Sequence, residues 1–277
     1  MTDVTSMDDA LVTYARDEHV GFITLKRPDK RNALNLKMWN AIDRALEATE
    51  RDPKVRVVIL RGEGKSFCAG LDLSPENDLL PLIMSQPTAA QKTIFFKEVK
   101  RIQAIHTRLE RLRVPSIAAI HGHCLGAGLE LALCCDIRLA CSDTVFALPE
   151  AKLAIITDVG GLQRLERIVG RGHAMEIAFR GHRFAAGRAR AINLVNDIYP
   201  DKETLDQKTL ELAQEIAANP PLAVQGAKDV MLFGDLGPLE RSLDYNAARS
   251  SMIMPSSDLI EAMAAYMEKR EGTFKGE

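Results

Sequence analysis

The stretch Gly122-His123-Cys124-Leu125-Gly126-Ala127-Gly128-Leu129-Glu130-Leu131-Ala132 decides how this chain folds. It follows Ser116 to Ile120, a short apolar run typical of a buried strand, and its glycines permit a tight turn. From Gly126 to Cys135 the pattern predicts a helix that is apolar on every face except at Glu130, and such a helix lies inside a protein. Burying an unpaired carboxylate costs several kcal/mol, so Glu130 is a candidate for proton chemistry.

Two further acids, Glu150 and Asp158, stand in apolar or glycine-rich surroundings later in the chain. Each has an ordinary structural explanation as well as a chemical one. Glu150 follows a proline, where a solvated loop glutamate is common, and Asp158 could cap the helix predicted to follow it. For Glu130 the structural alternative is a salt bridge with Arg138 or Arg164. Taken together, the three acids favour an enzyme that moves protons.

Short apolar strands alternate with helices through the first two hundred residues, which indicates a layered α/β body. The predicted strands are Leu11–Arg16, Val20–Leu25, Val57–Leu60, Ser116–Ile120, Ile137–Ala140 and Val145–Ala147, and the predicted helices are Leu36–Glu50 and Thr88–Leu112. No dinucleotide-binding fingerprint is present, which disfavours a plain Rossmann fold. Later segments are helical only, at Glu203–Ala218, Leu222–Leu232, Pro238–Ser250 and Asp258–Lys269. We therefore expect a body over residues 1–200 and a helical appendage over residues 201–277.

The composition narrows the class of protein. A chain of 277 residues with 46% hydrophobic residues can bury one large core. A net charge of −2 provides no overall field to attract nucleic acid or an anionic membrane. The five cysteines lack the paired spacing of a zinc site or a disulfide framework, the amino terminus lacks a signal peptide, and no apolar run could span a bilayer. We expect a cytoplasmic protein without a metal, a nucleic acid or a membrane as partner.

Two segments share one design, in which a buried strand runs into small residues. Val57–Leu60 leads to Ala69-Gly70-Leu71, and Ser116–Ile120 leads to Gly126-Ala127-Gly128. Small residues let a ligand approach the backbone, and unpaired N–H groups at such turns attract an anion. Two donors meeting on one oxygen would stabilise an enolate. Ordinary turns explain either segment alone equally well.

Six ordered motifs, from about Leu11 to the end of the chain, resemble the crotonase (enoyl-CoA hydratase/isomerase) superfamily. They are Arg27-Pro28-x-x-x-Asn32-Ala33-Leu34, Phe67-Cys68-Ala69-Gly70-Leu71-Asp72-Leu73, Gly122-x-x-x-Gly126-Ala127-Gly128-x-Glu130-Leu131-Ala132, Pro149-Glu150, Gly160-Gly161-Leu162-Gln163-Arg164-Leu165 and Lys269-Arg270-Glu271-Gly272-Thr273-Phe274. The resemblance implies a spiral of ββα repeats with a helical C-terminal subdomain that assembles as a homotrimer or homohexamer. It also implies an acyl-CoA substrate, with coenzyme A as part of that substrate and no separate cofactor.

The same resemblance assigns binding roles. The backbone N–H groups of Leu71 and Ala127 would form an oxyanion hole for the thioester oxygen. The coenzyme A site would comprise Arg27, Asn32, Ala33, Ala69, Gly70 and Leu73, with Phe274 and Lys275 reaching it from an adjacent subunit. The segment from Ser74 to Gln91 could shape the acyl pocket.

The three acids are compatible with two reactions, hydration and isomerisation. Hydratases of this superfamily use glutamates at the positions of Glu130 and Glu150 to activate water. The turn around Asp158, however, is similar to that of Δ3,5-Δ2,4-dienoyl-CoA isomerases. The resemblance implies that Glu150 and Asp158 would exchange protons with C2 and C6 of the substrate. Such isomerases usually carry aspartate where this chain has Glu130. We favour isomerisation, without assigning base and acid. The remote alternative is an RNA-binding homologue, which the balanced charge disfavours.

Overall fold

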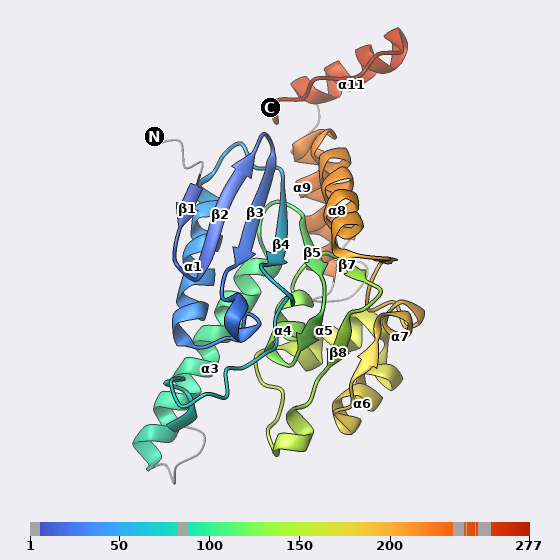
Figure 1. The fold of residues 1–277 in the computed structure, drawn as a ribbon. Coiled ribbons are helices and arrows are strands. Elements are labelled where there is room, and N and C mark those ends of the chain that lie inside the picture. Colours follow the sequence, from blue (N-terminus) through green and yellow to red (C-terminus); the bar gives the residue numbers. More distant parts are fainter. Residues whose placement is uncertain (1–5, 82–87, 235–240, 242, 247, 249–255) are drawn as a thin grey trace.

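The computed structural model describes residues 6–81, 88–234, 241, 243–246, 248 and 256–277. Within these residues the main sheet has the order β1-β2-β3-β4-β5-β7-β10 (Figure 1). Its strands are β1 (Ser6–Asp8), β2 (Val12–Asp17), β3 (Val20–Leu25), β4 (Val57–Gly62), β5 (Ser116–Ile120), β7 (Ile137–Cys141) and β10 (Asp197–Tyr199). The first two predicted strands correspond to β2 and β3, which pair antiparallel as a hairpin. From β3 to β10 the neighbouring strands are parallel, so their carboxyl ends share one edge.

Helix α1 (Leu36–Arg51) covers one face of this sheet and matches the helix predicted there. Asn35 accepts a hydrogen bond from the N–H of Met38, which caps the first turn. The buried face of α1 follows helical spacing through Met38, Ile42 and Leu46. Trp39, also buried, faces the neighbouring helix α3 (Ala89–Glu110), where its ring meets that of His106. Helices α1 and α3 therefore pack against each other and contribute to the same hydrophobic core.

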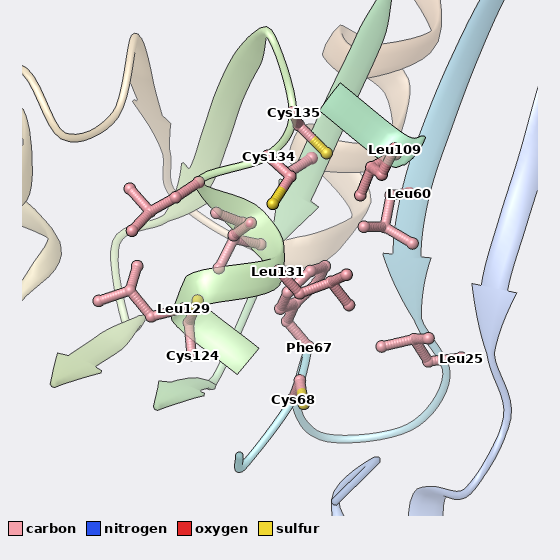
Figure 2. Packing of buried hydrophobic residues seen from close by; sticks show 14 of the residues in the cluster. Leu25, Leu60, Phe67, Cys68, Leu109, Cys124, Leu129, Leu131, Cys134 and Cys135 are labelled. Carbon is pink, nitrogen blue, oxygen red and sulfur yellow. The ribbon is translucent and has the colours of Figure 1, made fainter. Parts of the chain in front are cut away.

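A second sheet, β6-β8-β9, follows the glycine-rich turn. It comprises β6 (His123–Leu125), β8 (Val145–Ala147) and β9 (Phe184–Ala185), and α4 (Ala127–Ala132) begins directly after β6. As the sequence predicted, α4 is buried; Figure 2 shows its Leu129 and Leu131 packed among the core side chains. The helix ends before the predicted Cys135, because the N–H groups of Cys134 and Cys135 turn back to carbonyls only three residues earlier.

The rest of the body is helical. A short 3₁₀ helix, η2 (Glu150–Leu153), precedes α5 (Gly161–Val169), α6 (Arg171–Arg180) and α7 (Ala186–Ala191). Between η2 and α5 the segment 155–160 has neither helical nor strand structure. Asn193 adopts a φ of 60°, a conformation that asparagine tolerates.

The C-terminal part forms α8 (Lys202–Ala217), α9 (Pro221–Gly234) and α11 (Ser257–Glu268), close to the ranges predicted for them. The predicted helix Pro238–Ser250 lies largely outside the described residues. Leu205 and Ala213 of α8 pack with Val57 and Ile117 on the face of the sheet opposite α1. Helix α11 stands apart from the sheet, beyond the amino ends of the parallel strands (Figure 1).

Candidate active site

A cavity of about 160 Å³ lies beyond the carboxyl ends of β4 and β5. It brings together the three acids singled out from the sequence, Glu130, Glu150 and Asp158, with the two turns at Leu71 and Ala127. The apolar part of its wall is formed by Trp39, Leu73, Leu79, Phe95, Val99, Ile102, Leu153, Ile155 and Ile156. Leu79 comes from the segment expected to shape the acyl pocket, of which residues 82–87 lie outside the described part of the chain. The cavity lining thus combines three acids with a larger number of apolar side chains.

The N–H groups of Leu71 and Ala127 are available to a ligand, because neither donates to any described residue. Leu34 bridges the residues on either side of Leu71, with its N–H on Gly70 O at 2.7 Å and its own carbonyl accepting from Asp72 N–H at 2.9 Å. The N–H of Leu71 is therefore directed away from Leu34. Ala127 is the first residue of α4, a position whose N–H has no partner within its helix.

Glycine sets the distance between these two turns. Gly70 has a φ of +91°, and a Cβ placed on it would lie 2.6 Å from the carbonyl oxygen of Leu125 and 3.6 Å from the nitrogen of Ala127. A Cβ on Gly128 would lie 2.7 Å from the carbonyl oxygen of Cys68. Only glycine allows this approach of one backbone to the other, which places both free donors at one cavity.

Glu130 is buried, with 2% of its surface exposed, and its Oε1 accepts a hydrogen bond from the N–H of Gly161 at 2.8 Å. The salt-bridge alternative is wrong for both arginines. Arg138 donates to the carbonyls of Leu194 and Cys135, and Arg164 pairs with Glu110. Burial, assisted by the nearby negative acids, raises the pKa of Glu130 to about 8.

Asp158 does not cap α5, so the capping alternative is also wrong. The cap residue is Gly160, without a side-chain cap, and the carboxylate at this helix start is that of Glu130. The side chain of Asp158 instead lines the cavity, where burial raises its pKa. Burial also raises the pKa of Glu150, with a smaller contribution from the charge of Asp158. Glu150 Oε2 is buried without a hydrogen-bond partner in the described structure, which leaves it available to a ligand.

Glu130→Gln is expected to flatten the dependence of stability on pH. The pKa of Glu130 rises from 4.5 to about 8 on folding, so its favourable contribution is complete below 4.5 and is lost as the pH rises to about 8. Glutamine stays neutral and keeps an oxygen for the N–H of Gly161. The loss amounts to a few kcal/mol, since one pKa unit corresponds to about 1.4 kcal/mol. Urea unfolding at about pH 5 and about pH 9 measures it; equal pH dependence in both proteins would contradict the assignment.

The residues assigned to coenzyme A divide into three groups. Ala69, Gly70 and Leu73 line the cavity. Arg27 borders the same loop, where its Nη1 pairs with Asp72 at 2.6 Å and donates to the carbonyl of Ala33 at 3.0 Å.

Asn32 is fully buried, and its side chain holds the surrounding loop in place through hydrogen bonds. Its Nδ2 donates to the carbonyls of Glu63, Ser66 and Phe67, and its Oδ1 accepts from the N–H of Arg27. Four hydrogen bonds thus fix a turn in which Asn32 itself adopts a φ of 56°. Any contact with a ligand would come from that turn rather than from the asparagine side chain.

Phe274 and Lys275 lie at the opposite end of the sheet. Phe274 O accepts from Arg56 Nη2 at 2.6 Å, next to the amino end of β4, and the N–H of Lys275 donates to Asp258 Oδ1 at 2.7 Å. Since the cavity lies at the carboxyl ends of the strands, these two residues are far from the cavity of their own chain.

Neither metal ligands nor a membrane span is found in the described residues. They hold no group of three or more His, Cys, Asp and Glu side chains placed to bind a metal ion. His121 Nε2 contacts the carbonyl of Gly64, and His123 Nδ1 contacts Ser66 Oγ. None of the helices in the described ranges combines the length and the apolar character that crossing a bilayer requires.

Comparison with known proteins identifies the family. Residues 15–277 match the family model described as enoyl-CoA hydratase/isomerase, and the chain belongs to this family of enzymes. It is 38% identical to the peroxisomal Δ(3,5)-Δ(2,4)-dienoyl-CoA isomerase of Arabidopsis thaliana, over 93% of each chain. It is 34% identical to 2,3-dehydroadipyl-CoA hydratase of Escherichia coli, over 95% of this chain and 97% of the other.

A solved structure supports the fold. The enoyl-CoA hydratase of Bacillus anthracis superposes with a TM-score of 0.87 at 34% identity, covering 96% of this chain and 99% of the other. The predicted α/β crotonase fold and enzyme class are confirmed. Because the plant relative is named peroxisomal, the cytoplasmic location stays a prediction.

Proposed function

We propose that this enzyme isomerises 3,5-dienoyl-CoA to 2,4-dienoyl-CoA. The observation that carries the proposal is the side chain of Asp158, which lines the same cavity as Glu150 instead of capping α5. Moving two conjugated double bonds requires a proton to leave C2 and another to arrive at C6, a task for two acids along one extended chain. The dienoyl-CoA isomerase of Arabidopsis, at 38% identity, supports the same choice.

The thioester carbonyl would accept hydrogen bonds from the N–H groups of Leu71 and Ala127. Removal of a C2 proton by one ionised acid then gives a dienolate whose negative oxygen these donors stabilise. Proton delivery to C6 by the other, protonated acid restores a neutral product with the formula of the substrate. Burial raises the pKa of both Glu150 and Asp158, and the charge of Asp158 adds to the shift of Glu150, so the ionisation of one acid opposes the ionisation of the other.

Glu130 would assist this pair by staying uncharged near neutral pH. One of its oxygens is taken by the N–H of Gly161, and its raised pKa keeps it largely protonated at neutral pH. A neutral Glu130 adds no repulsion to the acid that must ionise. Its Glu side chain, one methylene longer than the aspartate of typical dienoyl-CoA isomerases, fits the distance to the start of α5.

Hydration of a 2-enoyl-CoA is the second candidate. Glu130 and Glu150 both line the cavity, as a hydratase requires of the acids that orient its water. The hydratase of Escherichia coli at 34% identity supports it. In that case Asp158 would have no direct part in the reaction.

The two candidates separate in a side-by-side spectrophotometric assay of the purified enzyme on a 3,5-dienoyl-CoA and a 2-enoyl-CoA. We expect kcat/KM for forming the conjugated 2,4-dienoyl thioester to exceed kcat/KM for hydration, because only isomerisation uses Asp158. Faster hydration than isomerisation would reject the proposal in favour of the second candidate.

Assembly completes the proposed site. We propose that residues 201–277 form a trimerisation subdomain, in trimers or pairs of trimers, that brings Phe274 and Lys275 to the coenzyme A of a neighbouring subunit. Their position at the end of the sheet opposite the cavity supports a role between chains. The substrate brings coenzyme A with it, and the proposed steps use no other cofactor.

A further inference from the structure

The main chain that carries Asp158 is held by helix α3. The carbonyl oxygen of Asp158 accepts a hydrogen bond from Gln103 Nε2 at 2.6 Å, and the carbonyl oxygen of Val159 one from His106 Nδ1 at 2.8 Å. These residues belong to the segment 155–160, which is neither helix nor strand, although the carbonyl of Gly160 accepts a helical hydrogen bond from the N–H of Arg164. Side chains of α3 therefore supply the hydrogen bonds that the carbonyls of Asp158 and Val159 would otherwise receive from a helix or a sheet.

The next carbonyl is tied to the same helix indirectly. Gly160 O accepts from Arg164 Nη1 at 3.3 Å, and Arg164 Nη2 pairs with Glu110 at 2.7 Å. Gln103, His106 and Glu110 are spaced three and four residues apart, so they form one stripe along α3. Two successive carbonyl groups, those of Asp158 and Val159, are thus held directly by one face of α3, and the third is held by Arg164 of α5.

His106 is suited to a fixed role. Its ring is fully buried and meets Trp39 edge to face at 5.0 Å. A carbonyl oxygen can only accept, so Nδ1 carries the proton and donates it to Val159. Burial lowers the pKa of His106 to about 4, which keeps the ring neutral and in this one tautomer near neutral pH.

Gln103 is held in one orientation. Lys100 Nζ donates to Gln103 Oε1 at 2.8 Å, which leaves the amide nitrogen for the carbonyl of Asp158. The amide group thus links an exposed cation of α3 to the segment beside the cavity.

A carboxylate that must gain and lose a proton is poorly positioned by hydrogen bonds to its own oxygens, because those bonds shift its pKa. Hydrogen bonds to the main-chain carbonyls of Asp158 and Val159 hold this segment without adding a donor to the carboxylate, which accepts a hydrogen bond from its own backbone. We propose that Gln103 and His106 are positioning residues, which fix Asp158 for proton transfer by holding the carbonyl groups of Asp158 and Val159. The inference rests on the proposed function insofar as it concerns turnover.

The first test is Gln103→Met, which keeps length and helix propensity but removes the donor. We expect kcat for dienoyl-CoA isomerisation to fall by about 10- to 100-fold, since small misplacement of a reacting group has effects of this size. KM should change little, because the donors at Leu71 and Ala127 are untouched. The matched control is Lys97→Met, on the exposed face of the same helix, for which we expect wild-type kinetics. Equal kcat in the Gln103 variant and the control would overturn the inference.

The second test uses the conservative replacement of His106. His106→Leu removes the hydrogen bond to Val159, whereas His106→Asn retains a donor near the position of Nδ1. We expect the leucine variant to lose kcat as the Gln103 variant does, and the asparagine variant to recover most of that loss. Equal loss in both would indicate a packing role only and would count against the proposal.

Hydrogen–deuterium exchange tests the positioning without any turnover. Amide exchange in residues 155–161 should be faster in Gln103→Met than in Lys97→Met, because the segment opens more often once the hydrogen bond from Gln103 to the carbonyl of Asp158 is lost. Unchanged exchange would overturn the inference even if isomerisation is established. If exchange is faster but the enzyme proves to be a hydratase, the positioning role of Gln103 is supported and only the proposed function is rejected.

Discussion

Asp158→Asn is expected to lower kcat for dienoyl-CoA isomerisation by about two to four orders of magnitude, the usual contribution of a positioned acid or base. Asparagine has nearly the same shape, so the cavity should keep its form, but it cannot exchange a proton. Glu150 would still be present at one end of the conjugated chain. Without its counterpart, the dienolate could not be formed and reprotonated at different carbons.

The measurement is steady-state turnover of a 3,5-dienoyl-CoA by wild type and variant. Asp143→Asn, at an exposed turn, provides the same chemical change away from the cavity and should leave turnover unaltered. If Asp158→Asn kept more than about a tenth of wild-type kcat, the acid would lie outside the range expected for general acid–base catalysis. Hydration of a 2-enoyl-CoA, assayed in parallel, reveals whether that reaction uses a different set of acids.

Ala127→Pro should reduce kcat by about 10²- to 10³-fold for every thioester that the enzyme accepts. Ala127 is the first residue of α4, where proline is tolerated by a helix but supplies no N–H. The substitution therefore removes one of the two donors proposed for the thioester oxygen while the helix can still form. Loss of both isomerisation and hydration distinguishes this effect from that of Asp158→Asn.

Ala89→Pro is the matched control, since Ala89 is the exposed first residue of α3 and lies after its capping residue Thr88. Thermal unfolding of the two proline variants should be similar if each helix accepts the substitution. Retention of wild-type kcat by Ala127→Pro, with an intact fold, would show that the thioester oxygen binds elsewhere.

Much of this site could be predicted from the order of small residues and acids along the chain. The small residues of the two turns predicted free N–H groups that a ligand could reach, and an acid in an apolar helix predicted the role of Glu130. The close approach of the two backbones at Gly70 and Gly128 emerged only from the structure. The link from Glu130 to Gly161 could not be predicted, because it joins residues that are distant in sequence and Asp158 offered a local cap.

The stripe on α3 was missed for a different reason. Gln103 and His106 carry spacing that any exposed or buried helix face shares, and the sequence alone does not indicate which carbonyls such side chains will meet. The end of α4 was misplaced because apolar residues continue to Cys135, whereas the hydrogen bonds tighten earlier. Tertiary contacts decide where the side chains of the α3 stripe bond, whereas local hydrogen bonds decide where α4 ends.

The two free donors are main-chain groups whose spacing is fixed by glycine contacts, whereas the acids are side chains from three separate segments. In the proposed mechanism, binding of the thioester carbonyl would therefore depend little on the side chains at positions 130, 150 and 158. A related enzyme with this arrangement could therefore replace one acid at a time and change its reaction while it still binds the same thioester group. Such modularity makes the scaffold readily evolvable, and it makes these three positions the natural targets for redesign.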